Sequence, residues 1–119
     1  MWTVTFPGKI LSPNKLKHWG TRSRQNKKFE KIILFEYRSQ KPNLQIPATI
    51  ELTRIAPREY DQDNLVAAFK GIRDSISQLF FPDSPRGVGD NHPELNWKYS
   101  QRRGLPKEYK IEIEISTKV

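Results

Sequence analysis

The sequence has no cysteine, only two histidines and no long run of apolar residues. Without cysteine, a disulfide scaffold, a thiol nucleophile and a zinc finger are all excluded. Two histidines argue against a histidine-rich metal centre, and no apolar stretch reaches the roughly 20 residues that a transmembrane helix needs. The first residues also lack the basic and apolar regions of a secretory signal. We therefore expect a soluble, cytoplasmic protein without a membrane segment.

Positive charge is what the sequence has in excess. Its 119 residues include 21 Lys and Arg against 13 Asp and Glu, which gives a formal net charge of +8. A chain of this length fits one domain, so residues 1–119 are taken as a single domain. A strongly basic domain favours a polyanionic partner, and nucleic acid is the first expectation.

Most of the excess charge lies in residues 14–31. One interpretation is a solvated helix face with its approach loop. The other is a surface that follows DNA phosphates, which nonspecific duplex binding requires. A single acid, Glu30, lies among the seven basic residues of this segment, which are Lys15, Lys17, Arg22, Arg24, Lys27, Lys28 and Lys31.

The aspartates are gathered elsewhere in the chain. Carboxylates repel phosphate, so on a DNA-binding protein they need a role of their own. Holding a divalent cation between carboxylates and a phosphate is one such role. All five aspartates lie within residues 61–90, namely Asp61, Asp63, Asp74, Asp83 and Asp90.

The hydrophobic pattern predicts an α+β fold. Alternation of apolar and polar residues predicts four strands, and a helical apolar period predicts two main helices. The order strand–helix–strand–helix–strand–strand indicates a mixed sheet of about four strands with helices packed on it. The strands are expected at 2–6, 48–55, 95–100 and 109–115, the helices at about 23–37 and 63–80, a long loop at 81–93 and a hairpin connection at 102–108.

The second predicted helix has two different faces. At 100° per residue, Asp63, Lys70 and Asp74 share one face, opposite a stripe of large apolar residues. One interpretation is structural: Lys70 and Asp74 form an i, i+4 ion pair, and Asp61 and Asp63 favour the helix N-terminus. The other is chemical, because Asp61 and Asp63 project to one side of an extended segment. With a third, loop carboxylate they would form an oxygen site that suits Mg²⁺.

Several motifs together resemble the RusA family of Holliday junction resolvases. They are Asp61-Gln62-Asp63-Asn64-Leu65, then Lys70 with Asp74-x-Ile76, then Gly89-Asp90-Asn91, preceded by an early Ser12-Pro13-Asn14 turn. The resemblance covers roughly residues 2–115. It implies a small, dimeric, Mg²⁺-dependent endonuclease that resolves branched DNA in recombination and repair, from a bacterial cell and often prophage-borne.

The resemblance also implies roles for particular residues. Asp61, Asp63 and one loop aspartate would bind Mg²⁺, with Mn²⁺ as a possible substitute, and Lys70 would assist catalysis. Asp83 and Asp90 are both open as the loop ligand. Asp90 is preferred because it directly precedes a predicted strand in the Gly-Asp-Asn context. The basic segment, together with Arg102 and Arg103, would grip the arms of a junction.

Two rival interpretations remain open. The protein could be a nucleic-acid-binding module without catalysis, in which the carboxylates are helix caps and ion-pair partners. It could instead be a metal nuclease that acts on a different DNA or RNA substrate.

Overall fold

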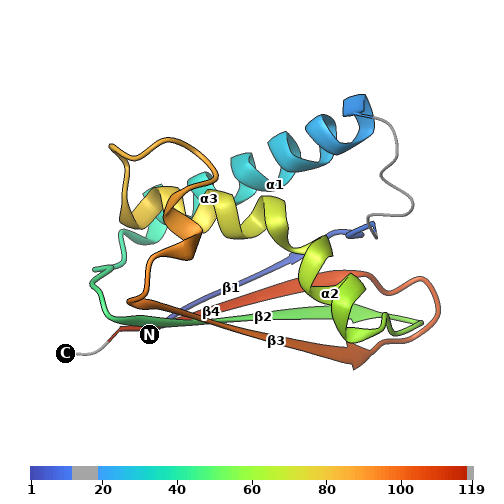
Figure 1. The fold of residues 1–119 in the computed structure, drawn as a ribbon. Helices are drawn as coiled ribbons and strands as arrows, with labels where there is room; N and C mark the ends of the chain where they lie inside the picture. The colour runs from blue at the N-terminus through green and yellow to red at the C-terminus, as the bar shows by residue number, and fades with distance from the viewer. Residues whose placement is uncertain (12–18, 118–119) are drawn as a thin grey trace.

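The computed structural model describes residues 1–11 and 19–117, and it has the predicted α+β fold in one domain (Figure 1). All four predicted strands are present within a few residues of the expected bounds. The first helix is longer than predicted at both ends. The elements are β1 (Trp2–Pro7), α1 (Trp19–Gln40), β2 (Ala48–Ala56), α2 (Gln62–Ala68), α3 (Lys70–Phe80), a 3₁₀ turn η1 (Gly89–Asn91), β3 (Leu95–Arg103) and β4 (Lys110–Thr117).

The sheet is mixed, with the strand order β1-β4-β2-β3. β4 is antiparallel to both β1 and β2, and β3 is parallel to β2. The predicted hairpin at 102–108 is therefore wrong, because β2 lies between β3 and β4. The connection crosses the end of β2 instead, and the N–H of Gly104 bonds the carbonyl of Ala56. The three inward isoleucines of β4 are buried, as are the inward residues of edge strand β1, whereas edge strand β3 is more exposed.

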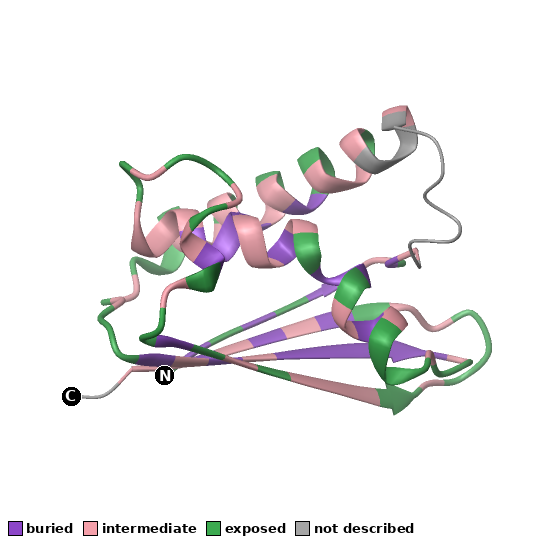
Figure 2. Cartoon of the chain, viewed as in Figure 1, coloured by how far each residue is buried: buried purple, intermediate pink, exposed green. Residues whose placement is uncertain are grey.

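The core lies between the sheet and the helices. Phe29 and Ile33 of α1 are buried, as are Phe69, Ile72 and Ile76 around α3. In Figure 1 the helices lie on one face of the sheet, and Figure 2 shows that the buried residues of helices and strands meet there. In the described part of the chain, no helix covers the other sheet face. The layers bury apolar area that stabilises the fold by the hydrophobic effect.

The predicted helix at 63–80 is divided in two. α2 ends at Ala68, α3 begins at Lys70, and Phe69 between them has φ −87° and ψ 1° instead of helical values. The side chain of Phe69 is fully buried. The change of direction at Phe69 lets Leu65 of α2 and Ile72 of α3 both reach the core. A single straight helix across 63–80 is therefore an incorrect prediction.

Across residues 1–11 and 19–117, none of the helices combines the length and apolar character that crossing a bilayer requires.

Candidate metal and nucleic-acid site

A pocket of about 690 Å³ lies between α1 and the two helices α2 and α3. Its volume is within the range of small-ligand sites in proteins. Gly71 at its edge is needed for the close approach of α1 and α3, because a Cβ there would run into the side chain of Asn26. The residues around the pocket that carry chemistry are Gln25, Asn26, Asp63, Lys70, Arg73 and Asp74.

Asp61 and Asp63 occupy the beginning of α2. Asp61 is the N-cap residue: its backbone is extended, and its Oδ1 accepts a 2.9 Å hydrogen bond from the N–H of Asn64. Its Oδ2 accepts from the side-chain amide of Asn64 at 3.2 Å. Asp63 in the first turn is exposed and lines the pocket. Of the two aspartates foreseen as caps of this helix, Asp61 is the N-cap residue and Asp63 is not; Asp63 lies exposed beside the pocket.

The segment before Asp61 is fixed by Tyr60, which the sequence analysis did not single out. The Tyr60 N–H donates to Oε1 of Gln101 at 2.9 Å, and Nε2 of Gln101 donates to the Tyr60 carbonyl at 2.6 Å. The Tyr60 hydroxyl donates to the carbonyl of Ile10 at 2.9 Å, and Arg54 stacks on its ring at 3.6 Å. Tyr60 therefore joins the approach to Asp61 to β2, to β3 and to the segment after β1.

Asp90 lies in η1 with a completely buried side chain. Its Oδ2 accepts from Nζ of Lys70 and from Nη2 of Arg73, both at 2.8 Å. Burial acts to raise the pKa of the Asp90 carboxyl, but the hydrogen bonds from Lys70 and Arg73, and then their charges, bring the pKa below its ordinary value. The Asp90 carbonyl also accepts from the indole of Trp97 at 2.9 Å. Asp90 therefore stays ionised and ties η1 to α3 and β3.

Lys70 bridges two carboxylates. Its Nζ lies 2.9 Å from Oδ1 of Asp74 and 2.8 Å from Oδ2 of Asp90, and its side chain is half exposed. Partial burial acts to lower the pKa of Lys70, but the hydrogen bonds to Asp90 and Asp74 and their negative charges raise it overall. At neutral pH Lys70 therefore carries a positive charge, so it can neutralise an anion but cannot serve as a base. The predicted Lys70–Asp74 pair is confirmed.

Arg73 is a site residue that sequence reasoning missed. Its Nη1 donates to the hydroxyl of Tyr99 at 2.7 Å, while its Nη2 holds Asp90. Two buried atoms of the Arg73–Asp90 ion pair have no hydrogen-bond partner among the described residues: Nε of Arg73 and Oδ1 of Asp90. The spacing of Lys70 and Arg73, three residues apart on one helix, was the only local signal. Their shared partner comes from twenty residues beyond Lys70 and is brought to them only by the fold.

The predicted ligands Asp61, Asp63 and Asp90 are hard oxygen donors of the kind that Mg²⁺ prefers. Within the described residues, however, no three or more Asp, Glu, His or Cys side chains are grouped closely enough to hold a metal ion. Asp63 faces the pocket, and Oδ1 of Asp90 is unpaired, so donors for a metal are present. Lys70 and Arg73 occupy the other Asp90 oxygen. The three-carboxylate ligand set stays a prediction. Asp83, the alternative loop ligand, is exposed.

The residues predicted to bind DNA fall in two places. Lys15 and Lys17 lie outside the described residues, as does the side chain of Arg22 in α1. The remainder of the basic segment is exposed along α1 and consists of Arg24, Lys27, Lys28 and Lys31. Arg102 and Arg103 lie at the end of β3, where Arg102 pairs with Glu112 at 3.1 Å.

Comparison of the sequence with protein-family models and with curated proteins gives no match. The residues of the site itself indicate its chemistry. An exposed carboxylate and a charged lysine line one pocket beside a basic helix. Such an arrangement can receive a phosphate group, whose charge Lys70 would offset.

Proposed function

We propose that this protein is a Mg²⁺-dependent endonuclease that hydrolyses phosphodiester bonds in branched DNA. One observation carries the proposal: a single pocket is lined by both Asp63 and Lys70, although they belong to separate helices, and the basic helix α1 forms its other side. A pocket with these groups suits a scissile phosphate. The choice of branched DNA, and of a four-way junction in particular, rests on the resemblance to the RusA family.

Asp61, Asp63 and Asp90 would hold the metal. When bound, Mg²⁺ would supply an activated water and offset charge that develops on the phosphate. The protein's own contribution begins with Lys70, whose positive charge would stabilise the phosphate in the transition state. Because Lys70 has a second carboxylate partner in Asp74, it can release Asp90 and still remain paired. Arg73 would keep Asp90 in place as Lys70 turns.

The proposal includes a homodimer that works in the bacterial cytoplasm, with Mn²⁺ able to replace Mg²⁺. Two-fold symmetry suits a four-way junction, which requires two matched nicks for its resolution. The basic residues of α1, together with Arg102 and Arg103, would contact the phosphates of the arms.

Asp63→Asn tests this function. The substitution removes the negative charge that faces the pocket and keeps the shape of the side chain. We expect cleavage of a labelled four-way junction in Mg²⁺ to fall by roughly 100-fold or more, with junction binding retained. The matched control is Glu94→Gln, the same loss of one negative charge on an exposed residue outside the pocket, which should cut like the wild type. Wild-type cleavage by Asp63→Asn would remove Asp63 from the site.

A binding module without catalysis is the second candidate, and two observations favour it. Asp61 already caps α2, and Asp90 is already paired with Lys70 and Arg73. This candidate predicts no cleavage in any divalent metal, and no change in melting temperature on addition of Mg²⁺ or Mn²⁺. A nuclease with another substrate is distinguished by comparing junction, duplex, flap and single-stranded DNA and RNA.

A further inference from the structure

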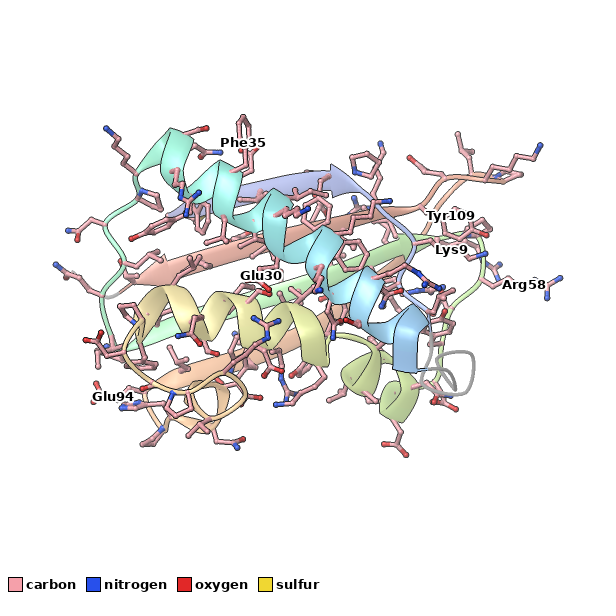
Figure 3. All side chains as sticks on the ribbon, turned by 90° about the horizontal axis from the view of Figure 1, so that it is seen from above. Lys9, Glu30, Phe35, Arg58, Glu94 and Tyr109 are labelled. Atoms are coloured by element: carbon pink, nitrogen blue, oxygen red, sulfur yellow. The ribbon has the colours of Figure 1, made fainter. Side chains whose placement is uncertain are left out.

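Basic residues are concentrated at one end of the sheet. The sheet topology brings together the C-terminal ends of β1, β2 and β3 and the beginning of β4. The segments at the opposite end, 41–47 and 92–94, contain only Lys41 and Glu94 as charged residues apart from His92. Figure 3 shows Lys9 and Arg58 at one end of the molecule and Glu94 at the other. The basic residues of this end, in segments 8–10, 57–61 and 102–110, are Lys9, Arg58, Arg102, Arg103, Lys107 and Lys110. The acidic residues of the same segments are Glu59, Asp61 and Glu108, so six basic residues stand against three acidic ones.

Four of these side chains have no carboxylate partner in the described part of the chain. Arg102 pairs with Glu112, and Lys110 pairs with Glu108. Lys9 stacks on a tyrosine ring and makes no ion pair with a described residue. An exposed cation without a carboxylate partner can pair with an anionic group of a ligand. We call the exposed side chains of Lys9, Arg58, Arg103 and Lys107 the sheet-end surface.

Hydrogen bonds connect β3, near the sheet-end surface, to the segment that precedes α2. The reciprocal hydrogen bonds between Tyr60 and Gln101 hold the residue before Asp61 against the residue two before Arg103. The N-terminal half of α1, α2 and the sheet-end surface all lie at the same end of the molecule (Figures 1 and 3). Basic charge is therefore present in both layers at this end: on α1 in the helix layer and on the loops of the sheet layer.

We propose that the sheet-end surface binds the phosphate backbone of a second duplex arm, while α1 binds the first. This inference rests on the proposed function and adds a basis for choosing branched DNA. In this arrangement a linear duplex occupies one basic surface at a time. Two arms that diverge from a branch at the pocket can occupy both surfaces of one protomer together. Simultaneous contact makes the second binding event intramolecular and raises affinity for the branched form.

The test compares three double variants that each lose two positive charges. Arg103→Gln with Lys107→Gln changes the sheet-end surface, and Lys27→Gln with Lys28→Gln changes α1. The control is Lys98→Gln with Lys41→Gln, because Lys98 is an exposed β3 residue on the uncovered sheet face and Lys41, like Lys107, has a positive φ. Fluorescence anisotropy in EDTA measures binding to a four-way junction and to a linear duplex, so cleavage plays no part.

Either surface variant should weaken junction binding roughly tenfold and reduce the slope of log affinity against log salt by about 1.8. The same variant should weaken linear duplex binding by no more than about threefold, because the other surface remains. The control should match the wild type on both substrates, and all three variants should keep the wild-type melting temperature.

Other outcomes overturn the inference. If the sheet-end variant binds the junction like the control, this surface contacts no arm, and the proposed function is unaffected. If the sheet-end variant weakens junction and duplex equally, the two surfaces form one continuous track for a single duplex. If the wild type binds neither substrate, the proposed function fails and this inference fails with it.

Discussion

The carboxylate of Asp90 is buried between Lys70 and Arg73, whereas that of Asp63 is exposed in the first turn of α2 beside the pocket. The resemblance to the RusA family predicts both as ligands of one metal ion. In the fold, burial makes Asp90 dependent on its cations, because an isolated buried charge is costly. The exposed carboxylate of Asp63 needs no cationic partner and is accessible to a ligand. Two identical side chains thus differ in their surroundings: Asp90 stabilises the fold through its two cations, and Asp63 is accessible to a ligand.

The largest expected difference is in stability. Asp90→Asn removes the charge partner of the mostly buried Arg73, while half-exposed Lys70 retains Asp74. We expect the free energy of unfolding to fall by about 2–4 kcal/mol, which is discounted from a fully buried pair because Lys70 can relax into solvent. Asp63→Asn should change it by no more than about 0.5 kcal/mol. Urea denaturation measures both, and equal losses would abolish the distinction.

The second difference is in pH dependence. A carboxyl whose pKa is lowered in the folded state stabilises the protein above its unfolded pKa of about 3.9, and this stability is lost as pH falls through the folded pKa. The gap in unfolding free energy between wild type and Asp90→Asn should therefore be nearly constant from about pH 5 to 8 and shrink below about pH 4. Urea titrations at a series of pH values check this. A gap that persisted at the lowest pH would mean that the charge of Asp90 is not its source.

The smallest expected effect separates two roles of Asp61. Asp61→Ala removes the N-cap bond to Asn64 and should cost about 1 kcal/mol of unfolding free energy. Asp61→Asn retains a good cap and should be nearly neutral, yet it removes the negative charge expected for metal binding. We therefore expect Asp61→Asn to keep the wild-type stability in urea and lose junction cleavage. Cleavage at the wild-type rate would limit Asp61 to capping.

The parts of the fold that depend on local pattern are predictable from the sequence. Alternation in β1 and β4 identifies both strands, because each residue's exposure depends on the face of the sheet to which it points. The neighbours of β4 were not predictable in this way. Sequence proximity suggests β3, but β4 pairs with β1 and β2, and the edge strand β1 shows the same alternating burial as β4, so the pattern alone does not give the neighbours. The break at Phe69 was hidden because its apolar stripe continues across both helices.

In the candidate site, too, local features were predictable from the sequence and long-range contacts were not. Asp61 and Asp63 are near each other in sequence, so their placement at a helix start could be anticipated. The ion pairs of Asp90 join residues 17 and 20 positions apart in sequence, and only the packing of η1 on α3 brings them together. Tyr60 was missed for the same reason, since its partners come from β2, β3 and the segment after β1.

The amide of Gln101 donates to the carbonyl and accepts from the N–H of the same residue, Tyr60. These are the two bonds that a peptide group in a neighbouring strand would provide. The side chain of Gln101, a residue of edge strand β3, thus pairs with Tyr60 as one residue of an adjacent strand would. A glutamate at this position could not donate, and an asparagine would be one methylene shorter. One side-chain amide therefore holds the backbone of the residue before Asp61, and the Tyr60 side chain adds its own contacts with Ile10 and Arg54.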